Sequence, residues 1–159
     1  MGSKDEFLKH LGVRQETQQS IVTVCMKKNF KRDIRSLDEV FDYLEGFISS
    51  NRLNESTAFV LKFAVEELFT NMVKHNASGP SEISIGLTVE PEKLLVRLVD
   101  RENFPFDVTK PDSADVDLGE EQRRPGGLGL YLTKRMVDKI DFEHVGDQSI
   151  ITFTLDTGK

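Results

Sequence analysis

The stretch that decides the fold is VEELFTNMVKHN, residues 65–76. It completes a longer segment, STAFVLKFAVEELFTNMVK, in which apolar residues recur with a period near 3.6, so the sequence predicts a helix. On a helical wheel with steps of about 100°, the middle of one apolar flank is formed by residues spaced by four: Val60, Ala64, Leu68 and Met72. We expect this flank to pack on the core of the domain and Asn54 to cap the start of the helix.

The same helix carries three polar residues that the apolar pattern does not explain. Glu67, Asn71 and His75 are also spaced by four, so they form one stripe that begins at the polar edge and drifts into the apolar arc. A buried carboxylate or amide costs free energy unless another group pairs with it. We therefore expect a ligand beside the stripe, although His75 alone has the simpler role of capping the last carbonyls of the helix.

The composition describes one soluble globular domain. The chain has 159 residues, of which 38% are hydrophobic and 30% are charged, which allows a real core and argues against a disordered chain. The formal net charge of −6 disfavours direct nucleic-acid binding, because no uniformly basic surface is available. The single cysteine, Cys25, is expected to be a buried strand thiol in a reducing cytoplasm. No apolar run approaches the length of a membrane span.

The order of the periodic segments predicts the fold class. Residues 1–19 are expected to be a tail or a short helix, and residues 20–159 a single domain. Within this domain the sequence predicts strands over residues 20–30, 81–90, 93–100, 141–145 and 149–156, helices over residues 34–48, 55–76 and 126–140, and a lid-like loop over about residues 101–125. Consecutive hairpins without strand–helix–strand alternation indicate an α+β fold, a two-layer sandwich in which one mostly antiparallel sheet carries its helices on one face.

Two further segments favour a shared ligand. Asp100 ends an apolar strand where the sheet gives way to the loop, and PGGLGL, residues 125–130, is a glycine-rich entry to a helix. Such an entry leaves backbone N–H groups without partners at the positive end of the helix dipole, which favours phosphate. The amide oxygen of Asn71 suits Mg²⁺, and Glu67 one turn away is placed to orient or deprotonate an attacking hydroxyl. Each feature alone also has a structural explanation, since Asp often opens turns and glycine-rich turns are common.

Together these motifs resemble those of the GHKL-type ATPase domain, and within it the small anti-sigma-factor serine/threonine kinases of bacterial stress and sporulation switches. VEELFTNMVKH is similar to the family's N-box, Glu-Leu-x-x-Asn-x-x-x-His, and RPGGLGLYLTKRMVD is similar to its second glycine box. LVDRENFPFD is similar to its first glycine box, Asp-x-Gly-x-Pro-Phe. The resemblance covers nearly the whole chain from about residue 20, and it implies the Bergerat, or GHKL, ATPase fold with an ATP lid.

The resemblance also implies ATP and Mg²⁺ as cofactors and gives each motif a role. Asn71 would ligate the Mg²⁺ that bridges the phosphates, Glu67 would be the general base, and Asp100 would accept a hydrogen bond from the adenine amino group. Arg123 and Arg124 stand at the lid edge, and their position and charge suggest contact with the γ-phosphate. The remaining nucleotide-binding residues implied by the motifs are His75, in a supporting role, and Gly126, Gly127, Leu128, Gly129 and Leu130.

The first glycine box departs from the family pattern. Glu102 stands where the family has glycine, and the segment is one residue longer before its Pro-Phe pair. The family's glycine lets the backbone pass close to the adenine, whereas a glutamate adds bulk and negative charge. Either the loop bulges and restores the pocket, or nucleotide binding is weak or lost, and the sequence leaves both outcomes open.

Three functions from different classes follow. The leading interpretation is an ATP-dependent serine/threonine protein kinase that is also an anti-sigma factor, with a sigma factor and a STAS-type anti-anti-sigma protein as partners and, by resemblance, a homodimeric state. The alternative is a degenerate, nucleotide-independent binding module of the same fold that sequesters a signalling partner. A metal-dependent hydrolase built on the helix stripe and Asp100 is disfavoured, because only His10 and His144 add further imidazoles. A histidine kinase fragment is disfavoured because no helix pair with a phosphoacceptor histidine precedes the domain in this sequence.

The predicted helix over residues 34–48 adds two expectations. Its start is predicted to be capped by Asp33 or Ser36, and its apolar stripe is expected to pack on the sheet. That stripe consists of Ile34, Leu37, Phe41, Leu44 and Ile48. The outer face, with Arg32, Arg35 and Asp38, is expected to meet a partner.

Overall fold

The computed structural model describes residues 23–75, 82–101, 107–109 and 127–157. Their secondary structure runs in the order β1 (Val24–Lys31), 3-10 helix η1 (Ile34–Ser36), α2 (Leu37–Asn51), α3 (Glu55–His75), β2 (Glu82–Val89), β3 (Lys93–Arg101), α4 (Gly127–Met136), β4 (Lys139–Val145) and β5 (Gln148–Asp156). Several predictions fall outside the described residues: the tail over residues 1–19, most of the lid, Glu102, Arg123, Arg124 and Gly126.

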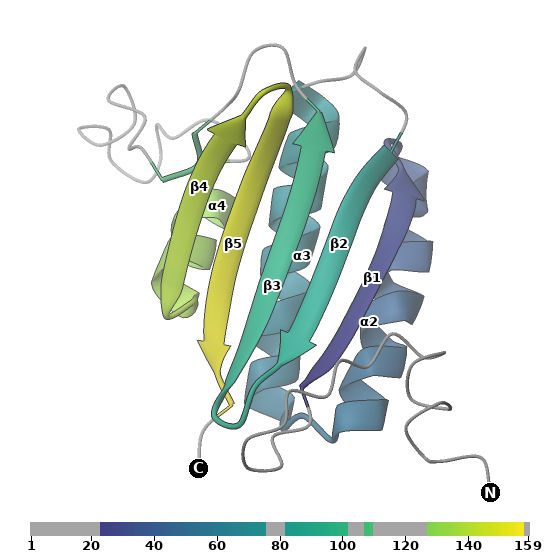
Figure 1. Ribbon diagram of the computed structural model, residues 1–159, viewed down its shortest axis with the longest axis vertical. Helices are drawn as coiled ribbons and strands as arrows, with labels where there is room; N and C mark the ends of the chain where they lie inside the picture. The colour runs from purple at the N-terminus through teal and green to yellow at the C-terminus, as the bar shows by residue number, and fades with distance from the viewer. Residues whose placement is uncertain (1–22, 76–81, 102–106, 110–126, 158–159) are drawn as a thin grey trace, which may run out of the picture.

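The strands form one five-stranded sheet in the order β1-β2-β3-β5-β4, and every pair of neighbours is antiparallel. The α-helices of the described residues all lie on one face of this sheet, with α2 behind β1, α3 behind the middle strands and α4 behind β4 (Figure 1). This arrangement confirms the predicted α+β two-layer fold. It also brings the C-terminal ends of β1, α3 and β3 to the same end of the molecule (Figure 1).

The core fills the space between the sheet and the helices. On β3, Leu94, Val96 and Leu98 are fully buried and alternate with more exposed residues, as the two-residue period of a strand requires. Asp100 continues the same alternation, so its carboxyl group is carried onto the buried face of the sheet. The strand therefore places a charged group inside the molecule at the end where α3 also finishes.

Helix α3 follows the predicted amphipathic pattern over most of its length. Ala64, Leu68 and Met72 are buried, whereas Val60 is only partly buried. The predicted cap is confirmed, because Asn54 Oδ1 accepts a hydrogen bond of 2.8 Å from the backbone N–H of Thr57.

The buried stripe of the helix before it lies beside the predicted one and shares Leu44 with it, while Leu37, Phe41 and Ile48 of the predicted stripe are partly buried and pack against the core. Asp33 accepts a hydrogen bond from the backbone N–H of Arg35 and caps η1, whereas the side chain of Ser36 makes no cap bond. Ile34 is 46% exposed. The buried stripe on α2 is Val40, Leu44 and Phe47. The prediction assumed one continuous α-helix, but residues 34–36 form a 3-10 turn with about three residues per turn, which takes Ile34 out of line with the stripe on α2.

The last predicted helix is too long, because Ile140 belongs to β4. Thr133 of α4 is buried, and so is Val137, the residue that follows the helix. Leu128 and Leu132, which are spaced by four on α4, are partly open to solvent, at 48% and 37% exposed. An apolar spacing of four can continue across a helix end, so the pattern alone did not locate the stop.

The expectation of a buried cysteine is also wrong. Cys25 lies on β1, an edge strand, opposite Thr88 of β2 and on the sheet face turned away from the helices, so it is exposed. Within the described part of the chain, no helix combines the length and the apolarity that a membrane crossing requires.

Candidate functional site

The predicted polar stripe lies along one side of α3, near its C-terminal half. Glu67 and Asn71 are partly buried, as expected for residues that drift into the apolar arc. His75, the last residue of α3, is exposed, so the expectation that the stripe turns inward fails at this end. Glu67, the expected base, and Asn71, the expected metal ligand, are thus the two stripe residues that are partly shielded from water.

The start of α4 meets the stripe at Glu67. A Cβ atom added to Gly129 would overlap the carboxylate of Glu67, which shows that this carboxylate lies directly against the first turn of α4. Only glycine permits this close approach of the Glu67 carboxylate to the backbone of α4. Gly127 begins α4, and Leu128, Gly129 and Leu130 complete its first turn. The structure therefore brings together two predicted motifs that are about sixty residues apart in the sequence.

Glu67 has an altered affinity for protons. Partial burial raises the pKa of the Glu67 carboxyl group, the neighbouring charge of Glu66 raises it further, and Lys74 opposes the change. A carboxylate with a raised pKa is a stronger proton acceptor at neutral pH than an ordinary glutamate. This property suits a general base.

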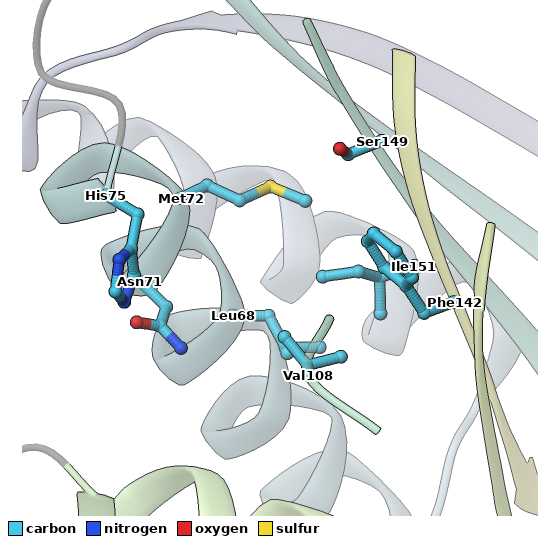
Figure 2. Close-up of a pocket in the computed structure, with 8 residues that line it drawn as sticks. All are labelled: Leu68, Asn71, Met72, His75, Val108, Phe142, Ser149 and Ile151. Carbon is cyan, nitrogen blue, oxygen red and sulfur yellow. The ribbon is translucent and has the colours of Figure 1, made fainter. Parts of the chain in front are cut away.

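A small pocket opens beside the same stretch of α3, with about 270 Å³ of empty space (Figure 2). Part of this space is open to solvent, and the enclosed part has room for roughly one water molecule. Its walls come from three parts of the fold: α3 contributes Leu68, Asn71, Met72 and His75, the segment 107–109 contributes Val108, and β4 and β5 contribute Phe142, Ser149 and Ile151. Most of this lining is apolar, and Asn71 and His75 supply polar groups from the helix wall (Figure 2).

Asp100 is buried in an ion pair. Its side chain is fully buried and that of Arg32 is 2% exposed. Arg32 Nη1 donates to Asp100 Oδ2 at 2.8 Å and to the backbone carbonyl of Met72 at 3.0 Å, while Arg32 Nη2 contacts Asp100 Oδ1. Arg32, the residue that follows β1, thus binds the end of α3 and the end of β3.

Arg32 corrects a prediction and marks what the sequence reasoning missed. It was expected on the outer face of the following helix, among residues that meet a partner, but it points into the molecule. A buried carboxylate at the end of an apolar strand requires a cationic partner, and this signal was present at Asp100. The sequence did not indicate which residue supplies the cation, because Arg32 and Asp100 are 68 residues apart in the chain. Val108, Phe142 and Ser149 of the pocket were also missed, since each looks like an ordinary loop or strand residue.

The described residues give little support to a metal-dependent hydrolase. They contain no group of three or more His, Cys, Asp or Glu side chains placed to hold a metal ion. Asp100 is paired with Arg32, and His144 Nδ1 lies 3.3 Å from the hydroxyl of Ser149. His10 lies outside the described residues.

The sequence profile of the histidine kinase-like ATPase domain matches residues 30–155, which is most of the chain. The chain belongs to this family. The match runs from the end of β1 to the end of β5, so it includes both glycine boxes, α3 and α4.

Relatives of this histidine kinase-like ATPase domain include the serine-protein kinase RsbW of Listeria monocytogenes. The two sequences are 34% identical over 96 residues, which cover 57% of this chain and 61% of the relative. The chain therefore spans about three fifths of the length of this curated relative.

Two solved structures share the fold. The RsbU and RsbW domains of Rv1364c from Mycobacterium tuberculosis align with a TM-score of 0.61 at 14% identity, over 85% of this chain and 33% of that one. The SiaB–SiaC complex from Pseudomonas aeruginosa contains a chain that aligns with a TM-score of 0.53 at 14% identity, over 95% of this chain and 94% of that one. At these identities the likeness establishes the architecture alone.

Proposed function

We propose that this chain binds Mg-ATP between α3 and α4 and transfers its γ-phosphoryl group to a serine or threonine of a partner protein. The observation that carries this proposal is the contact between the Glu67 carboxylate and Gly129, because it brings a proton acceptor to the N-terminus of α4. The N-terminus of a helix offers free backbone N–H groups to phosphate. Asn71, one turn of α3 beyond Glu67, offers the amide oxygen for the metal ion.

The two ends of the site fit Mg-ATP to different degrees. At the phosphate end, Gly129 lies against the Glu67 carboxylate, and Asn71 and Glu67 are only partly buried and so accessible. At the base end, the carboxylate of Asp100 is already bound to Arg32, so an adenine amino group would have to compete for it. The phosphate end therefore supports the proposal, and the base end is treated separately below.

The chain's own residues account for the other parts of the reaction. When bound, Mg-ATP supplies the phosphoryl group and the cation that neutralises its charge. Asn71 would hold that cation, and Gly127 and Gly129 would allow the backbone N–H groups of α4 to approach the phosphates. Glu67 would accept the proton of the attacking hydroxyl, aided by its raised pKa. His75 lies one turn further along α3 and would support the site from its edge.

The partners belong to the same proposal. The relative named serine-protein kinase RsbW supports a serine/threonine kinase, and the family resemblance implies an anti-sigma factor in a partner-switching module. We place the protein in the cytoplasm, as a homodimer that binds a sigma factor and phosphorylates a STAS-type anti-anti-sigma protein.

Phosphotransfer to a purified STAS-type candidate tests this function. Substituting Glu67→Ala removes the base and should lower the rate of transfer by about 10² to 10⁴, while the binding of Mg-ATP is retained. Glu55→Ala is the matched control, because Glu55 is an exposed glutamate of α3, about three turns before Glu67, and has no proposed role. Equal rates in the Glu67→Ala variant and the wild type would remove Glu67 from the role of base.

One observation favours a second candidate, a nucleotide-independent binding module. The capture of Asp100 by Arg32 removes the carboxylate expected to recognise adenine. This function predicts that affinity for the partner, measured by titration calorimetry, is the same with and without Mg-ATP. The kinase proposal predicts that partner affinity depends on the nucleotide.

A further inference from the structure

The buried pair of Arg32 and Asp100 lies directly behind the inner wall of the pocket. Asp100 is opposite Ser149 in the register of β3 and β5, and the carbonyl of Met72 accepts a hydrogen bond from Arg32. Met72 and Ser149 both line the pocket, whereas its lining includes neither member of the pair. Figure 2 shows Met72 extending from α3 toward the strand that carries Ser149. The pocket therefore does not reach Asp100, because Met72 and Ser149 lie between them.

The geometry of the pair explains why the carboxylate of Asp100 is closed off from the pocket. A guanidinium group is always charged at physiological pH, and its planar fork matches the two oxygens of a carboxylate. Arg32 uses this fork on Asp100, since Nη1 contacts Oδ2 and Nη2 contacts Oδ1. Removing one partner from a buried pair leaves an uncompensated charge, so the pair resists separation.

A second arginine in the same connection shows the contrast. Arg35 pairs with Asp33 only three residues further along, but its side chain is 88% exposed. A pair in that position is screened by water and contributes little to stability. The connection between β1 and α2 thus carries two arginines that pair with aspartates, and only the buried pair contains a predicted ligand-binding residue.

We propose that Arg32 competes with the nucleotide base for Asp100, so that the base end of the site opens only when the guanidinium releases the carboxylate. This inference rests on the proposed function, because it assumes that a nucleotide occupies the site. A protein whose binding-competent state is only partly populated shows an apparent affinity reduced by that fraction. Arg32 therefore sets the affinity for a base that carries an amino group, without contacting the phosphates.

Titration calorimetry of the full chain tests the competition. In Arg32→Met, a side chain of similar length no longer engages Asp100, and Mg-ATP should bind at least about tenfold more tightly than to the wild type. Mg-inosine triphosphate, which has a carbonyl oxygen in place of the adenine amino group, should bind with an affinity within about twofold of the wild-type value. The titrations are made at pH 8, so that the carboxylate stays ionised.

Arg35→Met is the matched control and should leave both affinities unchanged. Arg32→Lys keeps a cation beside Asp100 but loses the two-pronged contact, so it should gain ATP affinity in the same direction, and it serves if Arg32→Met does not fold. Unchanged or weaker ATP binding in the folded Arg32 variants would overturn the competition, as would an equal gain for both nucleotides. If neither the wild type nor any folded variant binds a nucleotide, the proposed function itself fails.

Discussion

Gly129 is the residue on which the position of the Glu67 carboxylate depends. Any larger residue at this position would place its Cβ atom on the carboxylate of Glu67. That carboxylate is the far end of a flexible side chain, so the overlap is relieved when Glu67 rotates away rather than when the helices separate. The position of the proposed base is therefore more sensitive to Gly129 than the packing of the helices is.

Substituting Gly129→Ala should displace Glu67 toward water and change the pH dependence of stability. In the wild type, burial raises the pKa of Glu67, so the folded state holds this proton more tightly than the unfolded state does. The free energy of unfolding then falls as the pH rises from the ordinary glutamate pKa through the raised one. In the variant the pKa returns toward its ordinary value, and this fall should be smaller.

Denaturant unfolding of both proteins between about pH 4 and pH 7 measures this difference. Stability at a single pH should differ by less than about 1 kcal/mol, because the helix propensity of alanine offsets the local rearrangement. Gly46→Ala is the control, since a Cβ atom there meets open space and should leave the pH slope unchanged. An unchanged slope in Gly129→Ala would contradict the contact.

At this scale the sequence predicted the polar stripe but not its surroundings. A spacing of four residues is enough to place Glu67 and Asn71 on one side of a helix. It carries no information about which residue faces them from another element. The contact with Gly129 and the pairing of Arg32 with Asp100 both depend on how distant segments pack, so only the structure revealed them.

At the scale of single elements, helix caps explain where the helices begin. Asn54 satisfies the backbone N–H of Thr57 at the start of α3, whereas Ser36 makes no such bond at the start of α2. Caps are local and can be predicted from sequence, as Asn54 was. The end of α4 was not predicted, because its apolar spacing continues into β4 and only pairing with β5 assigns Ile140 to a strand.

Substituting Asn54→Ala should lower the free energy of unfolding by about 1 kcal/mol, because one backbone donor of α3 loses its acceptor. For a chain of this size the midpoint of thermal unfolding should fall by about 2–4 °C. Ser36→Ala is the control, and its midpoint should stay close to that of the wild type. Equal losses in the two variants would show that the side-chain bond of Asn54 does not stabilise α3.

At the scale of the whole molecule, the order of hairpins and helices was sufficient to predict the layers. Antiparallel neighbours joined by short turns leave one sheet face for the helices, and the observed order β1-β2-β3-β5-β4 satisfies this condition. The same architecture places α3 and α4 side by side, which creates the site. The shape of that site was beyond the sequence, because it depends on how side chains of α3, β4, β5 and the segment 107–109 pack together.

The central claim, a Mg-ATP site between α3 and α4, is tested most directly by thermal unfolding with and without Mg-ATP, with Asn71→Ala as the control. A ligand present at about 100 times its dissociation constant adds roughly 2.7 kcal/mol to stability. For this chain that corresponds to an increase of about 5–11 °C in the unfolding midpoint. The account predicts such an increase, dependent on Mg²⁺ and lost in Asn71→Ala. An unchanged midpoint at millimolar Mg-ATP would contradict it.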